Sequence, residues 1–277
     1  MNCIEMRNVT LEVDGQRYLD GADLTVKAGE SIVIAGLPGC GKSFVTRLIL
    51  GLPGMDDDQV TVAGDIIVAG DNVPELSSRD LQALRRRVGS VMREGGLIEN
   101  MDIRTNVMLP LTYHYQNILG PAEIQARCDA VLEDLQLSHL GKVGIRPVAI
   151  NREERMYSSL ARALVCEPFL LLLDELCAGF SPGSARRLCR YAFSYEPSFS
   201  TPLSEPQAPA LTRIATTVDL GRYLDVAARF VLMWDGRLES IGDRAAVLAS
   251  TDVRVRQLLD IDPEPAGDVP ELAALHG

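Results

Sequence analysis

The spacing of apolar residues divides the chain into three stretches. Over roughly the first ninety residues, short apolar runs alternate with turn signals such as Asp14-Gly15, which is typical of β-strands. From about Leu97 to Arg162 the apolar residues recur three and four positions apart, which is typical of helices. Short apolar runs then return, beginning with a leucine-rich run at 169–175. The pattern predicts an α/β protein with a helical insertion.

The individual runs predict where the strands and helices lie. Gly120-Pro121 separates two helices of the insertion, and the proline- and serine-rich stretch 196–209 is expected to be a loop. We expect strands at 4–11, 19–26, 31–35, 60–68, 88–92, 169–175, 211–217, 230–233 and 237–241, and helices at 44–50, 81–87, 103–117, 122–135 and 184–195.

This order of elements implies a domain organisation. Residues 1–92 and 163–250 are expected to form an α/β core with an antiparallel β section, and residues 93–162 an α-helical subdomain inserted into that core. Residues 251–277 are an acidic, proline-containing C-terminal tail. A chain of 277 residues is long enough for one large domain with such an insertion.

Composition narrows the class of protein. The net charge of −11 argues against a nucleic-acid partner, and we interpret Arg85-Arg86-Arg87 as a solvated helix end rather than a basic patch. The six cysteines show no C-x-x-C spacing, so we expect reduced thiols that serve in packing. No apolar run approaches the roughly 20 residues that span a bilayer, and no signal-peptide pattern is visible at Met1. A cytoplasmic location is therefore expected.

One glycine-rich stretch carries the strongest chemical signal. It matches G-x-x-x-x-G-K-[ST] in full, and it lies between an apolar β-branched run and an apolar stretch with helical spacing. Strand, glycine-rich loop and helix together form a phosphate-binding loop, because the backbone N–H groups and the helix N-terminus attract anions. Lys42 is expected to reach the β- and γ-phosphates and Ser43 to bind Mg²⁺. The predicted nucleotide-binding residues are Gly36, Leu37, Pro38, Gly39, Cys40, Gly41, Lys42, Ser43 and Phe44.

A second signal lies about 130 residues downstream of that loop. The leucine-rich run ends in Asp174 and Glu175, where an ATPase with a phosphate-binding loop places two carboxylates. Asp174 is expected to hold Mg²⁺, and Glu175 to orient or deprotonate the attacking water as the catalytic residue. A buried strand that merely ends in solvated carboxylates is the alternative. ATP and Mg²⁺ are thus the predicted ligands.

Taken together, these motifs resemble a known family. Their order, with the late strand pair around Trp234-Asp235-Gly236-Arg237, looks like the nucleotide-binding subunits of ABC transporters over about residues 4–250. A finer likeness lies at 96–111, which is similar to the L-F-x-x-M-x-x-x-x-N-V-x-x-P-L stretch of ATPases in Mla/Mce-type phospholipid-transport systems. The resemblance implies a P-loop NTPase core of ABC ATPase type. It also implies a membrane permease as partner, a homodimer or a heterodimer with a second ATPase subunit, and a peripheral position on the inner face of the cell membrane.

The chain departs from this family at several positions that surround the nucleotide. Arg93 stands where the resemblance places the Q-loop glutamine, Ser181 where it places the D-loop aspartate, and Val218 where it places the switch histidine. Residues 150–154 stand in place of the signature L-S-G-G-x. The aromatic residue that the resemblance stacks on adenine has no clear match, since Leu11 and Val13 occupy the neighbourhood, and Tyr18 is a candidate substitute. We therefore expect ATP binding with weak hydrolysis through Glu175, because lost transition-state contacts typically cost about 10²–10³ in rate each.

The segment in place of the signature has a structural interpretation. Asn151 and Glu154 have the spacing of a helix N-cap and its third residue, which together form a capping box. A helix N-terminus satisfied by its own side chains is less available to an incoming phosphate. Arg152 could offset the charges of Glu153 and Glu154.

Two further functions compete with that of a transporter ATPase. A degenerate regulatory or structural nucleotide-binding subunit, paired with an active ATPase, is favoured by the departures at Arg93 and Val218. An unrelated kinase or GTPase is disfavoured, since no N-K-x-D guanine motif is present. For the transporter function, we expect a permease contact around 93–100 and 106–111, with an exposed apolar surface made by Leu97, Ile98, Met101 and Met108.

Overall fold

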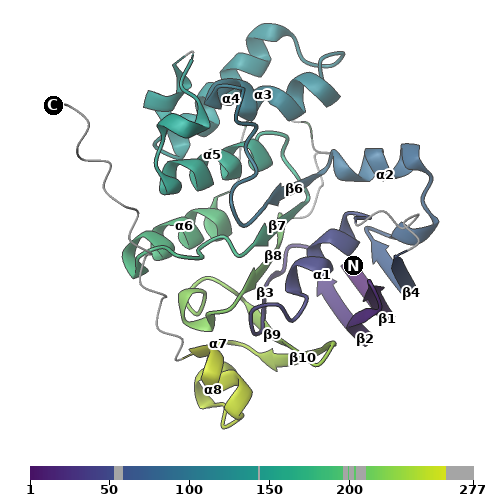
Figure 1. Cartoon of the computed structure of the whole chain (residues 1–277). Helices are drawn as coiled ribbons and strands as arrows, with labels where there is room; N and C mark the ends of the chain where they lie inside the picture. The colour runs from purple at the N-terminus through teal and green to yellow at the C-terminus, as the bar shows by residue number, and fades with distance from the viewer. Residues whose placement is uncertain (53–58, 143, 196–198, 200–202, 204–209, 260–277) are drawn as a thin grey trace, which may run out of the picture.

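A computed structural model describes residues 1–52, 59–142, 144–195, 199, 203 and 210–259. Two β-sheets organise it (Figure 1). The smaller sheet is antiparallel, in the order β2-β1-β4-β5, and the larger has the order β10-β9-β3-β8-β7-β6. Strands β9, β3, β8, β7 and β6 are parallel, and β10 runs antiparallel to β9 at one edge. The strands are β1 Asn2–Val13, β2 Gln16–Lys27, β3 Ser31–Ala35, β4 Val60–Val68, β5 Asp71–Asn72, β6 Val88–Val91, β7 Leu170–Asp174, β8 Thr212–Thr217, β9 Arg229–Trp234 and β10 Arg237–Gly242.

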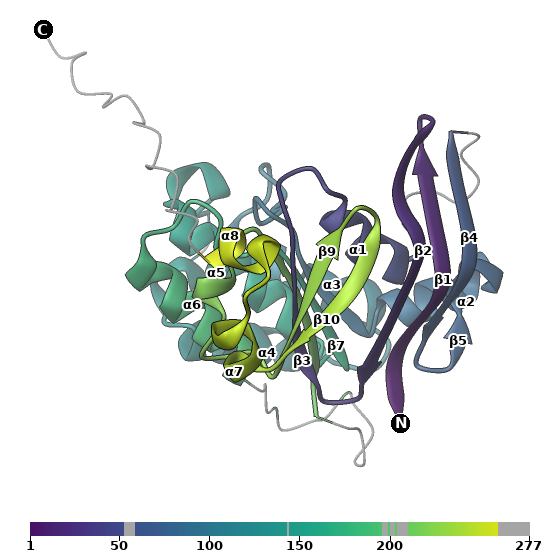
Figure 2. The same ribbon diagram turned by 90° about the horizontal axis from the view of Figure 1, so that it is seen from below.

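The larger sheet is buried on both faces, as the continuous apolar run of β7 predicts. Alternate residues of a strand point to opposite faces. Ile32, Ile34 and Leu172 accordingly join the cluster that contains the smaller sheet and α1, which lies between the two sheets (Figure 2). Val33 and Leu173 join the cluster that contains the helices of the opposite side. The described helices are α1 Lys42–Ile49, α2 Ser78–Arg85, α3 Ile103–His114, α4 Pro121–Asp134, α5 Arg152–Leu164, α6 Pro182–Ser194, α7 Arg244–Ala249 and α8 Val253–Leu259, with short 3₁₀ turns at Val73–Glu75, Ser138–Gly141, Pro147–Ala149 and Leu220–Arg222.

Most of the predicted elements are confirmed, with shifts at their ends that side-chain caps explain. Helix α2 begins at Ser78 rather than residue 81, because the Ser77 hydroxyl accepts a hydrogen bond from the Asp80 amide. Helix α6 begins at Pro182 rather than 184, because Ser181 caps it in the same way. Helix α3 ends at His114, three residues before the predicted end. Helices α7 and α8 were not predicted, and most of the expected loop 196–209 and the tail from residue 260 lie outside the described residues.

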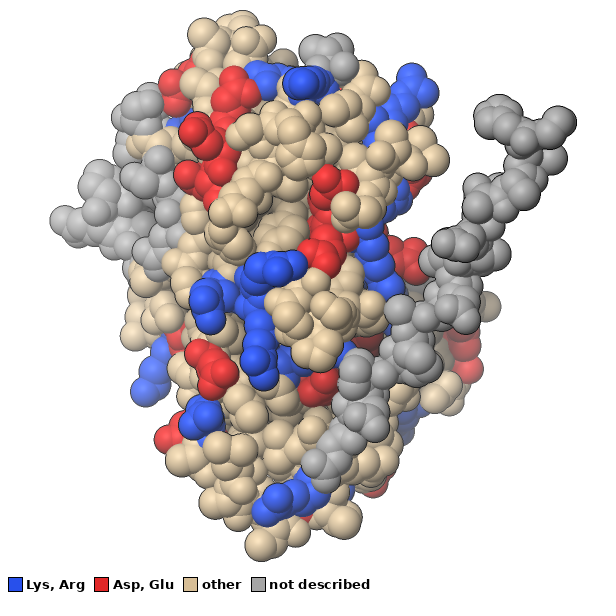
Figure 3. Space-filling model, turned by 90° about the vertical axis from the view of Figure 1, so that its left-hand side faces the viewer, with Lys and Arg blue, Asp and Glu red and all other residues tan. Residues whose placement is uncertain are grey.

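Positive charge gathers locally on this acidic protein. Figure 3 shows the molecule from the left-hand side of Figure 1, where α5 and α6 lie. Lys and Arg side chains gather near the middle of that face. Helix α6 supplies three exposed arginines, Arg186, Arg187 and Arg190. Within the described part of the chain, no helix is both long enough and apolar enough to cross a membrane.

Candidate functional site

The glycine-rich loop joins the carboxyl end of β3 to the first residue of α1. Gly41 is the N-cap of α1 with a φ of 103°, in the left-handed region that favours glycine, and it offers no side-chain cap. Position 36 has room only for glycine, since a Cβ there would lie 2.6 Å from the Met233 carbonyl oxygen. The first turn of α1 also contains no acidic residue. The helix therefore presents an uncapped, positively polarised N-terminus, which suits an anion.

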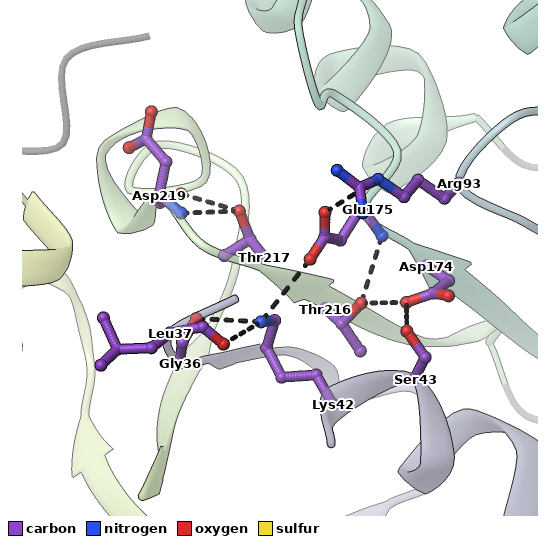
Figure 4. A network of polar contacts seen from close by, with 10 residues as sticks. All are labelled: Gly36, Leu37, Lys42, Ser43, Arg93, Asp174, Glu175, Thr216, Thr217 and Asp219. Atoms are coloured by element: carbon purple, nitrogen blue, oxygen red, sulfur yellow. Dashed lines mark hydrogen bonds and ion pairs between the residues drawn. The ribbon is translucent and has the colours of Figure 1, made fainter. Parts of the chain in front are cut away.

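Lys42, the first residue of α1, turns back into this loop (Figure 4). Its side chain is only 3% exposed, and its Nζ donates hydrogen bonds to the carbonyl oxygens of Gly36 and Leu37, both at 2.9 Å. The same nitrogen lies 3.5 Å from Glu175 Oε1. A buried ammonium group beside the uncapped N-terminus of α1 is placed to meet a phosphate.

A set of oxygen atoms lies beside Lys42. Ser43 Oγ donates to Asp174 Oδ1 at 2.9 Å, and Thr216 Oγ1 donates to the same oxygen at 2.6 Å. A hydroxyl and a carboxylate fit Mg²⁺, which prefers oxygen ligands and takes one or two from the protein, with phosphates and waters completing its shell. Ser43 and Asp174 are the residues that would hold it.

Glu175 is held in an unusual backbone conformation. Its φ is +48°, and its N–H lies 3.1 Å from Thr216 Oγ1 and 3.2 Å from the Thr216 carbonyl oxygen. The carboxylate is 11% exposed, and Arg93 Nε lies 3.4 Å from Oε2 (Figure 4). Arg93 comes from the loop that follows β6. The structure thus brings Lys42, Ser43, Asp174 and Glu175 together, as the motifs predict.

Thr216 and Thr217 are site residues that the sequence analysis missed. The register pairs Thr216 with Asp174 across the parallel strands β8 and β7, so both side chains emerge at one edge of the sheet. The available signal was the predicted strand 211–217, whose carboxyl end had to lie near the same edge. Thr217 Oγ1 accepts a hydrogen bond from the Asp219 N–H at 3.0 Å.

The segment that contains Val218 is tied to the segment after Glu175. Arg222 Nε pairs with Asp219 Oδ2 at 2.7 Å, and its guanidinium also donates to the carbonyl oxygens of Cys177 and Phe180. Val218 offers no hydrogen-bonding side chain. Arg222 thus fixes the position of both segments beside the oxygen cluster.

The capping box predicted at the start of α5 is present. Asn151 Oδ1 accepts from the Glu154 N–H at 2.9 Å, and Glu154 Oε2 accepts from the Asn151 N–H at 3.0 Å. Glu153 is also engaged, by the Ser184 hydroxyl and by Arg187 at 3.4 Å. Arg152 lies over the Phe180 ring, with its guanidinium carbon 5.5 Å from the ring centroid.

An aromatic pair stands beside the glycine-rich loop. The ring centroids of Tyr18 and Phe44 are 4.6 Å apart, and a Cβ on Gly41 would lie 3.2 Å from Tyr18 Cβ. Tyr18 therefore lies against the glycine-rich loop.

The expected exposed apolar surface is wrong, because Leu97 is buried and Ile98, Met101 and Met108 are only half-exposed. Leu97 is 8% exposed and belongs to the core, because the segment before α3 folds inward around Asn106. The buried Asn106 amide donates to the carbonyl oxygens of Ile98, Met101 and Asp102 and accepts from the Ile98 N–H. Met108 packs against the same core.

Comparison with known proteins identifies the family. The family model described as ABC transporter matches residues 19–178. The chain belongs to the ABC transporter family. Members of this family bind ATP together with Mg²⁺, which agrees with the ligand preferences of the site.

Several curated relatives cover much of the chain. The methionine import ATP-binding protein MetN of Caulobacter vibrioides is 36% identical over 177 residues, 63% of this chain and 49% of MetN. The sulfate/thiosulfate import ATP-binding protein CysA of Methylococcus capsulatus is 30% identical over 86% of this chain and 62% of CysA. The intermembrane phospholipid transport system ATP-binding protein MlaF of Escherichia coli is 28% identical over 94% of this chain and 89% of MlaF. The chain therefore spans about half the length of this MetN and most of MlaF.

Solved structures share the fold. CbiO1 from Clostridium perfringens, described as part of the ABC transporter complex cbiONQ, aligns with a TM-score of 0.73 at 21% identity, covering 90% of this chain and 91% of cbiO1. A dimeric structure of the bacterial ABC transporter cassette MJ0796 aligns with a TM-score of 0.69 at 23% identity, covering 85% and 96%. The fold is thus the ABC ATPase fold of the P-loop class, with its antiparallel sheet and its helices.

Proposed function

We propose that this chain binds Mg-ATP at the cluster of Lys42, Ser43, Asp174 and Glu175 and thereby drives an ABC transporter. The observation that carries the proposal is the convergence of these four side chains at the uncapped N-terminus of α1. Gly36 to Phe44 would wrap the phosphates, Lys42 would neutralise the β- and γ-phosphates, and Tyr18 would contact the base. Support also comes from the family, whose members bind ATP.

We assign hydrolysis to Glu175 and expect it to be slow. Water attacks the γ-phosphorus, the bond from that phosphorus to the β–γ bridging oxygen breaks, and Glu175 accepts the proton of the water, giving ADP and phosphate. Val218 cannot donate to the γ-phosphate, and the start of α5 is satisfied by its own side chains. Two groups that would stabilise transition-state charge are therefore missing.

The transported cargo belongs to the finer part of the proposal. We favour a lipid-transport system of Mla/Mce type, for import or export, because MlaF matches nearly the whole of both chains. MetN and CysA, which are named for methionine and for sulfate/thiosulfate, match at higher identity over a smaller share of their own length. A degenerate regulatory subunit is the second candidate, and it rests on Arg93, Val218 and the closed end of α5.

The partners follow from this function. We propose a dimer, with a second copy or a second ATPase subunit, bound to a membrane permease from the cytoplasmic side. A groove of about 370 Å³ between α3 and the edge strand β6 suits a permease helix. Its lining includes Val88, Leu109, Pro110 and Tyr113, and Tyr113 is 72% exposed. We retain 93–162 as the subdomain that carries much of this contact.

Equilibrium binding of ATP with and without Mg²⁺ tests the proposed site. Ser43→Ala and Asp174→Asn are expected to remove most of the increase in ATP affinity that Mg²⁺ gives, since the Ser43 and Asp174 side chains would be its protein ligands. The matched controls Ser194→Ala and Asp225→Asn lie outside the site and are expected to bind as wild type. Wild-type protein that binds no ATP at millimolar concentration would refute the proposal.

The transporter assignment has a separate test. Co-expression with the genes that neighbour this one, followed by purification through a tag on this chain, should recover an integral membrane protein. Tyr113→Asp, which places a charge in the groove, should reduce that recovery and leave ATP binding intact. Recovery of no membrane protein would contradict the transporter function.

A further inference from the structure

The Glu175 carboxylate is shared between two cations that come from different elements. Lys42 Nζ lies 3.5 Å from Oε1 and Arg93 Nε lies 3.4 Å from Oε2, so each oxygen faces one cation (Figure 4). The carboxylate has little freedom to leave them, because the backbone of Glu175 is anchored to Thr216. Its near-burial, at 11% exposed, distinguishes it from surface pairs such as Arg155–Glu99, in which the carboxylate is 58% exposed.

The two cations differ in their other contacts and in their exposure. Lys42 is buried and also holds two carbonyl oxygens of the glycine-rich loop, so an entering phosphate competes for it directly. Arg93 is 65% exposed and extends from the loop after β6, and Glu175 is the one ion-pair partner it has within the described residues. A nucleotide that takes Lys42 leaves the carboxylate with Arg93.

We propose that Arg93 is a positioning residue that restrains Glu175 and keeps basal ATP hydrolysis low, an inference that rests on the proposed function of the site. A guanidinium stays charged at every physiological pH and only donates. The ion pair holds Oε2 toward Arg93 and resists the rotation that would turn the carboxylate toward an attacking water. Hydrolysis is then faster when Arg93 swings away, which its exposed side chain permits. Arg93 thus acts on Glu175 rather than on the substrate.

The first test measures the contact without any nucleotide. Urea unfolding of the wild type, Arg93→Gln, Glu175→Gln and the double variant gives a double-mutant cycle. We expect the double variant to depart from the product of the single effects on the unfolding equilibrium constant by about 1.5- to 5-fold, the range of a partly exposed ion pair. Effects that simply multiply would overturn the proposal. This result does not depend on ATP binding, so it separates the proposal from the proposed function.

The second test follows turnover at saturating Mg-ATP. Arg93→Gln and Arg93→Met should each raise kcat about two- to fivefold with KM changed less than about twofold, and the methionine variant excludes a gain that comes from the new glutamine itself. Arg93→Lys, which keeps the charge, should stay near wild type. Arg79→Gln, an exposed arginine of α2, is the matched control and should leave both constants unchanged. The gain in Arg93→Gln should vanish in the double variant with Glu175→Gln. The proposal would be overturned if the kcat of Arg93→Gln were at or below that of the wild type. It would also be overturned if Arg93→Gln turned over ATP no faster than the double variant.

Discussion

Helices α1 and α5 begin in opposite ways, although both start with a basic residue. Lys42 opens α1 behind a glycine cap, with no acidic residue in the first turn. Arg152 opens α5 behind Asn151, and two glutamates occupy the first turn in a capping box. No side chain caps the first turn of α1, whereas in α5 the Glu154 N–H is bonded to Asn151 Oδ1 and Glu154 bonds back to the Asn151 N–H. The difference favours anion binding at α1, because an uncapped helix N-terminus leaves N–H groups without a side-chain partner.

The largest test of this comparison exchanges the first residue of each helix for alanine. A ligand at a hundredfold excess over its Kd stabilises the native state by about 2.7 kcal/mol, so Mg-ATP should raise the wild-type Tm by roughly 5–10 °C. Lys42→Ala should abolish that rise, because Lys42 is buried at the loop. Arg152→Ala should preserve it in the isolated chain. Equal loss in both variants, measured by scanning calorimetry, would remove the distinction between the two ends.

A second test concerns the inward-folded segment before α3, whose backbone groups are bonded to a side chain of α3. Asn106 makes four hydrogen bonds to this segment and is fully buried. Asn106→Ala leaves buried polar groups unpaired, so it should lower the free energy of unfolding by about 2–3 kcal/mol. Asn117→Ala, at an exposed position, should change it by less than about 0.5 kcal/mol. A small effect at Asn106, measured by urea unfolding, would show that water replaces these bonds.

The sequence predicted the parts of the site that depend on local chemistry. The loop 36–43, the carboxylates after β7 and the capping box at Asn151 each follow from spacing within one segment. Contacts that depend on strand order could not be predicted from one segment. Strand β8 lies between β3 and β7, and its pairing with β7 brings Thr216 to Asp174. The Arg93–Glu175 pair joins two such segments. The expectation that Leu97 is exposed was wrong. Apolar spacing does not reveal which face of an irregular segment packs inward.

The third test uses the thiol within the glycine-rich loop. All six cysteines are free and five are buried, which leaves Cys40 as the accessible one. Burial raises the pKa of the Cys40 thiol above its ordinary 9.0, an effect that outweighs the opposing influence of Lys42. Since the thiolate is the nucleophile, alkylation of Cys40 should rise about tenfold per pH unit from pH 7 to 9.

Mg-ATP should protect Cys40 from alkylation, because the phosphates would cover the loop. Cys40→Ser should remove the fast-reacting thiol, which mass spectrometry of the modified chain would reveal. A rate that levels off below pH 8 would contradict the raised pKa. Equal rates with and without Mg-ATP would place the nucleotide elsewhere, and the contrast between α1 and α5 would lose its functional meaning.

The smallest effect is expected at the capped N-terminus of α5. Asn151→Ala removes the side-chain cap and should cost about 1 kcal/mol of stability, whereas Asn151→Asp keeps an acceptor and should cost little. Neither change should alter Mg-ATP affinity in the isolated chain by more than about twofold, because the α5 cap is bonded to its own helix. Chemical denaturation and ATP titration of the same three proteins separate the two effects. If Asn151→Ala weakened ATP binding tenfold at unchanged stability, Asn151 would be a ligand-binding residue, and α5 would resemble α1 in function despite its cap.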